Sequence, residues 1–205
     1  MTIRASLSLV VGGLDDANLI RAIVGKDIAP RLRFFAAQGR ASLVTIGRNV
    51  LIHEGGPVLL VMDSDTRNRH LVEEMRSMAG LAMSGATAGG FGGGFSGVGS
   101  GTLASPPLFE VYVFVPDIDV MFFESPDVLR RLLGTVVTEE RLREGMLTPK
   151  ETLSLLLRES GKYASHSALV IAASEPEVAE ALASGQQASA LVGTIKPMTN
   201  ELLAR

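Results

Sequence analysis

The first 83 residues alternate between short strand-like runs, two of them nearly continuous in apolar character, and longer stretches in which apolar residues recur at helical spacing. The strand-like runs cover residues 5–11, 31–36 and 58–62, and the helical stretches lie at about 18–24, 40–53 and 68–83. A nearly continuous apolar run is typical of a strand in a parallel sheet that helices cover on both faces. The alternation therefore predicts an α/β fold, with a mainly parallel sheet flanked by helices and joined by right-handed crossovers.

The composition changes abruptly after residue 83. Residues 84–107 are rich in glycine and serine and are too long for an ordinary connection, so we expect a flexible insertion. Residues 109–115 predict a fourth strand, and the remainder predicts a helical C-terminal part, with residues 166–173 open between strand and helix. The tail, residues 188–204, is expected to be helical with a break at Lys196-Pro197. We expect one domain over 1–205, with a core at 1–83 and a fourth strand plus helices at 108–205.

Composition excludes several classes of site. Of the 205 residues, 46% are hydrophobic and 20% charged, which suffices for a packed core, and the absence of cysteine excludes disulfides, thiolate nucleophiles and cysteine-ligated metals. A formal net charge of −3 argues against sequence-independent nucleic-acid binding driven by bulk charge. No apolar run approaches the length of a membrane span and no export signal is evident, so we predict a cytoplasmic protein with no membrane partner.

Acidic residues follow two of the predicted strands. Gly12-Gly13 ends the first strand and leads to Asp15 and Asp16, either of which is a good helix N-cap. Asp63-Ser64-Asp65 directly follows residues 58–62, and alternate side chains of a strand point the same way. If the first and third strands are neighbours, both loops meet at the carboxyl edge of the sheet, where ligands bind in open α/β folds. Paired carboxylates there suit Mg²⁺ (or Mn²⁺) with phosphates, although the same aspartates also suit a simple helix cap.

The order LSLVVGGLDD, then PVLLVMDSDT, resembles the toprim domain of topoisomerases, primases, OLD-type nucleases and recombination proteins. In that family the first strand ends in Glu-Gly, with an Asp often three residues later, and the third strand ends in Asp-x-Asp. The resemblance covers about residues 5–66 and places Gly13 on the motif glycine and Asp16 on the later Asp. Asp63 and Asp65 fall on the Asp-x-Asp, which implies Mg²⁺ ligands. More weakly, VPDIDVMFF is similar to a Pro-x-Ile-Glu stretch in stand-alone members, which implies Asp119 as a further acid.

Gly12 occupies the position of the family's glutamate, the residue taken to act as general acid/base. Glycine has no side chain with which to transfer a proton, so three outcomes stay open. The site binds metal and phosphate without catalysis, or Asp15, Asp16 or Asp119 substitutes for the glutamate, or metal-activated water suffices. Gly12-Gly13 itself is either a phosphate-cradling turn or an ordinary tight turn.

The resemblance implies a protein that binds Mg²⁺ and nucleic-acid phosphates, as a metal-dependent nuclease or as the effector partner of an ATPase in phage defence. The implied catalytic residues are Asp16, Asp63 and Asp65, and the implied metal ligands are Asp63, Asp65 and Asp119. The alternative is a catalytically inactive interaction or regulatory subunit, and a third is a small-molecule phosphate binder or hydrolase. The basic segment from Arg67 to His70 either meets a phosphate backbone or is a solvated helix start. A basic-rimmed cleft around Asp63 and Asp65 would favour nucleic acid, and a flat apolar patch the interaction subunit.

Overall fold

The computed structural model describes residues 6–88 and 109–202. Within these residues lies one four-stranded parallel sheet in the order β2-β1-β3-β4. The strands are β1 (Leu7–Val11), β2 (Leu32–Ala36), β3 (Val58–Asp63) and β4 (Phe109–Phe114). In the register Leu9 lies opposite Phe34 on β2 and Leu59 on β3. The parallel sheet predicted from the alternating pattern is thus confirmed, and β1 and β3 are neighbours.

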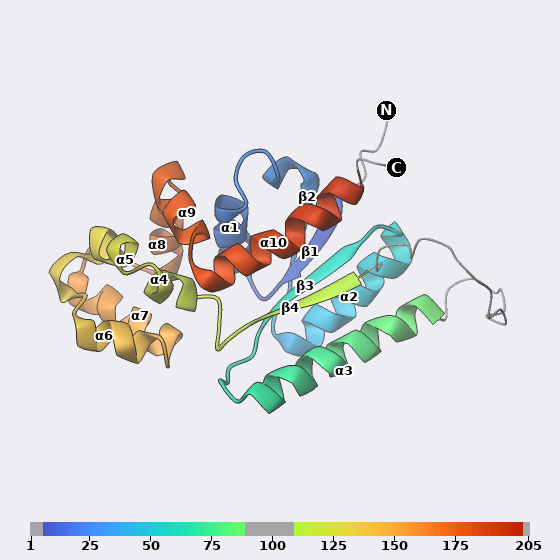
Figure 1. The fold of residues 1–205 in the computed structure, drawn as a ribbon, viewed down its shortest axis with the longest axis horizontal. Helices are drawn as coiled ribbons and strands as arrows, with labels where there is room; N and C mark the ends of the chain where they lie inside the picture. The colour runs from blue at the N-terminus through green and yellow to red at the C-terminus, as the bar shows by residue number, and fades with distance from the viewer. Residues whose placement is uncertain (1–5, 89–108, 203–205) are drawn as a thin grey trace.

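Helices cover both faces of the sheet (Figure 1). On one face lie α2 (Arg40–Glu54) and α3 (Arg69–Ala88), and on the other α1 (Leu14–Ile23) and α10 (Gln186–Glu201). Every residue of β1 is buried, as expected for a central strand covered on both sides. None of the helices in the described residues is long and apolar enough to cross a bilayer.

The C-terminal part gathers near the end of the sheet at which β4 leads into α4 (Figure 1). Its helices are α4 (Val120–Glu124), α5 (Pro126–Leu133), α6 (Glu139–Gly145), α7 (Pro149–Ser160), α8 (His166–Ala173) and α9 (Pro176–Ala183), with 3₁₀ turns at Ala29–Arg31 and Gly134–Val136. Phe122, Leu153 and Leu169 of this part belong to the same buried cluster as Leu9 and Ile20. The helical part therefore shares a core with the sheet.

Three boundary predictions need correction. The N-cap of α1 is Gly13, not Asp15 or Asp16. The prediction of a break at Lys196-Pro197 is wrong, because α10 runs through Pro197. Ile195 and Met198 are buried on either side of it, so packing outweighs the one lost helical hydrogen bond. α3 extends to Ala88, and the remainder of the predicted insertion at 84–107 lies outside the described residues.

Hydrogen bonds join the loop after β3 to the segment after β4. The amide of Asp65 donates to the carbonyl of Pro116 at 2.8 Å, and the Ser64 hydroxyl also donates to that carbonyl at 3.2 Å. Gln187 of α10 then fixes Val115, whose amide donates to Gln187 Oε1 at 2.8 Å and whose carbonyl accepts from Nε2 at 2.7 Å. Two acidic loops that are far apart in sequence are therefore held in one fixed arrangement.

Candidate functional site

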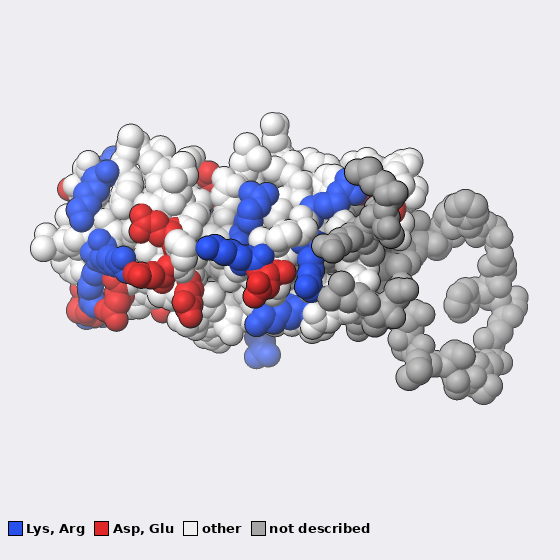
Figure 2. Space-filling model, turned by 90° about the horizontal axis from the view of Figure 1, so that it is seen from above, with Lys and Arg blue, Asp and Glu red and all other residues white. Residues whose placement is uncertain are grey.

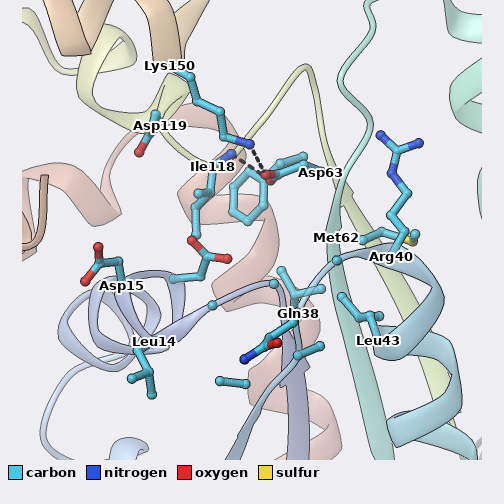
Figure 3. Close-up of a pocket in the computed structure, with 18 of the residues that line it drawn as sticks. Leu14, Asp15, Gln38, Arg40, Leu43, Met62, Asp63, Ile118, Asp119 and Lys150 are labelled. Atoms are coloured by element: carbon cyan, nitrogen blue, oxygen red, sulfur yellow. Dashed lines mark hydrogen bonds and ion pairs between the residues drawn. The ribbon is translucent and has the colours of Figure 1, made fainter.

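A cleft of about 1120 Å³ lies at the carboxyl edge of the sheet (Figure 3). The loops after β1, β2, β3 and β4 contribute to it, and α7 and α8 supply further side chains. It lies where strand order reverses, since β2 is on one side of β1 and β3 on the other. Open α/β sheets bind ligands at this point.

Asp63 and Asp65 converge on one cation, the ammonium of Lys150. Asp63 ends β3; its Oδ2 accepts from Lys150 Nζ at 2.7 Å, and its Oδ1 accepts from the amide of Ile118 at 3.0 Å (Figure 3). Asp65 lies just beyond the strand with φ 50°, its Oδ1 is 3.7 Å from Lys150 Nζ, and Arg40 also pairs with it. The predicted convergence of the two carboxylates is thus present, with an internal ammonium between them.

Asp16 lies against Gly12. Its Oδ2 is 2.8 Å from the place that a Cβ on residue 12 would take, so the Asp16 carboxylate fills the space beside the glycine. Burial raises the pKa of Asp16 to about 6, and the charges of Asp63 and Asp119 add to the effect. The chain therefore places a carboxyl group that titrates near neutral pH beside the position without a side chain.

Asp119 and Asp15 are bridged by a histidine. His166 Nε2 is 2.8 Å from Asp119 Oδ1 and its Nδ1 is 3.2 Å from Asp15 Oδ2, to which the Ser167 hydroxyl also donates at 2.8 Å. The hydrogen bond to Asp119 raises the pKa of His166 to about 9, against the opposing effect of burial. The imidazole is therefore cationic at neutral pH, with both nitrogens donating to carboxylates.

The cleft has an excess of negative charge. Burial raises the pKa of Asp63, although its hydrogen bond to Lys150 opposes the rise. Burial tends to lower the pKa of Lys150, but the hydrogen bond and charge of Asp63 outweigh it and raise the value. Among the described residues that line the cleft, the acids are Asp15, Asp16, Asp63, Asp65 and Asp119, and the cations are Arg40, Lys150 and His166. Carboxylates thus outnumber cations, which favours the entry of a further positive charge.

No group of three carboxylate or imidazole side chains in the described residues is arranged to hold a metal ion. Of the three predicted ligands, Asp63 and Asp65 approach each other at Lys150, whereas Asp119 lines the same cleft and is turned to His166. A metal site made wholly of protein ligands is therefore not preformed. Mg²⁺ is commonly held by only one or two carboxylates, with phosphate and water oxygens completing its shell.

The predicted basic segment lies at the start of α3, where Arg67, Arg69 and His70 are exposed. A second cavity of about 790 Å³ is lined by this turn and by the Glu73–Arg76 ion pair. Figure 2, which is seen from above Figure 1 and so from the side of α9 and α10, shows blue and red side chains interspersed over the described surface of that face. The cleft itself is lined by five aspartates and by Arg40, Lys150 and His166, so it is a mixed-charge hollow and not a flat apolar patch.

Sequence reasoning missed Lys150, His166 and Arg40 as site residues. Lys150 is 87 residues from Asp63, and His166 is 151 residues from Asp15, so no local pattern in the sequence predicts either contact. Comparison of the chain with protein-family models, curated proteins and solved structures finds no match. The function therefore has to be argued from the cleft.

Proposed function

We propose that the chain is a toprim-like protein that binds nucleic-acid phosphates, together with a divalent cation, in the cleft at the carboxyl edge of its sheet. The observation that carries the proposal is the convergence of Asp16, Asp63 and Asp65 on one open cleft at the strand-order reversal. The parallel order β2-β1-β3-β4 is consistent with the resemblance seen in the sequence.

The donor set fits a hard cation. Asp63 and Asp65 are oxygen donors that already share a positive charge, and the cleft carries more negative than positive groups. These two carboxylates would hold Mg²⁺ or Mn²⁺, with the phosphate supplying further oxygens. When bound, the cation would neutralise charge on the phosphate.

Asp16 is proposed as the proton-transfer group. A glutamate acts at the position of Gly12 in the resembled family, and here Asp16 Oδ2 occupies the space into which such a side chain would start. A carboxyl group so placed can accept a proton from an attacking water or return one to a leaving oxygen. A side chain at residue 12 would have to displace the Asp16 carboxylate, which is the flexible end of that side chain.

The surroundings favour a nucleic-acid phosphate over a small phosphate ester. The cleft is open and large, and the exposed Arg67 and Arg69 follow its lining residue Asp65 closely in the chain, at the start of α3. Cations spaced along a surface are suited to successive phosphates of a strand. We expect Arg67→Ala with Arg69→Ala to weaken binding of a long single-stranded oligonucleotide several-fold while leaving mononucleotide binding unchanged.

The proposal is tested by cleavage of plasmid, single-stranded DNA and RNA with Mg²⁺ or Mn²⁺. Wild type should cleave, Asp63→Asn should abolish cleavage, and Asp16→Asn should reduce it by about 10²- to 10⁴-fold. The double substitution Gly12→Glu with Asp16→Gly removes the collision and transfers the acid to position 12, so it should restore activity. Cleavage that is unaffected by Asp63→Asn or Asp16→Asn would refute the assignment.

A second candidate is a catalytically inactive toprim-like interaction subunit. It is favoured by the pairing of Asp63 with Lys150 and of Asp119 with His166, which leaves no preformed three-ligand metal group among the described residues. Silence of wild type and of the Gly12→Glu double variant, with no oligonucleotide binding, would select it. The ATPase partner and the phage-defence setting implied by the resemblance stay predictions, to be tested by co-purification from the native host.

A further inference from the structure

Lys150 reaches the acidic pair from a different part of the chain. It is in the first turn of α7, and its ammonium extends to Asp63 Oδ2 at 2.7 Å (Figure 3). The same ammonium is 3.7 Å from Asp65 Oδ1. The Lys150 side chain is 48% exposed, so water lies on one side of it. The ammonium therefore occupies the position between the two carboxylates while keeping a route out.

The backbone of α7 fixes where this side chain starts. Leu153 and Leu156 are fully buried in the core that the helical part shares with the sheet, and Pro149 stands at the first helical position. A lysine in the first turn lies at the positive end of the helix dipole, which is unfavourable for it. The attraction of Asp63 and Asp65 offsets this unfavourable interaction with the helix dipole. The ammonium is therefore held in place by the two carboxylates, while the dipole of α7 opposes its position.

We propose that Lys150 is a tethered counter-ion that competes with the divalent cation for Asp63 and Asp65. The ammonium already occupies Asp63 Oδ2, and a divalent cation held by the same two carboxylates would be repelled by it. A metal therefore enters only when the Lys150 side chain turns outward. This inference rests on the proposed function, since it concerns the same pair of carboxylates.

The competition also gives Lys150 a second position. Because Lys150 lines the cleft, its displaced ammonium would still be available to a phosphate bound there. Lysine is a common point-charge ligand of phosphate. Metal and phosphate should therefore bind wild type more tightly together than either does alone.

The test is a Mn²⁺ titration of the purified full chain, with free aqueous Mn²⁺ followed by electron paramagnetic resonance. Lys150→Met keeps the aliphatic stem and removes the charge, and Lys150→Gln is a second variant with a polar tip. Lys26→Met, an exposed lysine in the loop after α1, is the matched control for loss of one positive charge. Both Lys150 variants should bind Mn²⁺ at least about tenfold more tightly than wild type and the control.

Adding Asp63→Asn to Lys150→Met should abolish the gain, which locates the metal at the acidic pair. Equal Mn²⁺ affinity in wild type and both folded Lys150 variants would overturn the inference while leaving the proposed cation site standing. Absence of Mn²⁺ binding in every variant would overturn both. A gain that survives Asp63→Asn would overturn the inference, because the metal would then lie elsewhere.

Discussion

Replacing Asp16 by asparagine should stabilise the fold. A pKa raised from 3.8 to about 6 means that the folded state disfavours the ionised Asp16 carboxylate by about 3 kcal/mol relative to the unfolded chain. Water in the open cleft screens part of this cost, so we expect Asp16→Asn to raise the free energy of unfolding by about 1 to 2 kcal/mol near neutral pH. Asparagine keeps the size of the side chain and removes the charge that Asp63 and Asp119 oppose.

The gain should depend on pH in a defined direction. A carboxyl group whose pKa is raised in the folded state contributes stability below its unfolded pKa, and that contribution is lost as pH rises through the folded pKa. Wild type and Asp16→Asn should therefore have similar stability at about pH 4 and should diverge between about pH 4 and pH 6. Urea unfolding followed by circular dichroism at several pH values measures this difference.

Asp27→Asn is a suitable control, because Asp27 is an exposed aspartate in the loop after α1. It should change the stability by less than about 0.5 kcal/mol. If Asp16→Asn were less stable than wild type near neutral pH, or if its gain persisted at low pH, the electrostatic account of the cleft would be refuted. A stabilised but inactive variant would instead indicate that this carboxyl group is kept for function at the expense of stability.

Two further predictions test the frame around the site. Gly145→Ala should destabilise the fold by about 1 to 3 kcal/mol, because its Cβ would lie 1.9 Å from Phe123 Cε1. Gly80→Ala should instead stabilise α3 by up to about 1 kcal/mol, because no atom lies within 4 Å of the added Cβ. Thermal melts of the two variants measure both changes. His166→Gln should lower the free energy of unfolding by about 1 to 2 kcal/mol at about pH 6 and hardly at all at about pH 10. The reason is that a histidine whose pKa is raised to about 9 in the folded state stabilises the fold below its unfolded pKa, and this stabilisation is lost as the pH rises through about 9. Urea titrations at the two pH values check the histidine; an equal loss at both would show that the Asp119 contact is not ionic.

The sheet could be predicted from the sequence because its signals are local. The five residues before Asp63, Val58 to Met62, are all apolar, and a strand covered on both faces buries every one of them. The order of the strands could not be predicted from the sequence: that β1 and β3 are neighbours was only a condition there, and the structure shows that it is met. Pro197 was misjudged because the local cost of a proline is visible in the sequence, whereas the buried neighbours that outweigh it are not.

The acidic residues of the candidate site could be predicted from the sequence, but their cationic partners could not. Asp16, Asp63 and Asp65 follow strands directly, so the fold class alone places them at the carboxyl edge. Asp15 or Asp16 was expected to cap α1, but the helix already begins at Leu14, and the Asp15 carboxylate contacts His166 and Ser167 instead. That contact depends on a helix more than 150 residues distant in the chain, which no local pattern encodes.

The helical C-terminal part is therefore a component of the site and not an appendage to it. The acidic residues of the first 83 positions are met by cations from α7 and α8, with Lys150 on Asp63 and His166 on Asp15. Without those helices, Arg40 would be the sole cation among the described residues lining the cleft, and the carboxylates would repel one another. The same helices also complete the core that buries β1. Charge compensation and packing thus have one source, so the N-terminal motif alone does not describe the surroundings of Asp63 and Asp65.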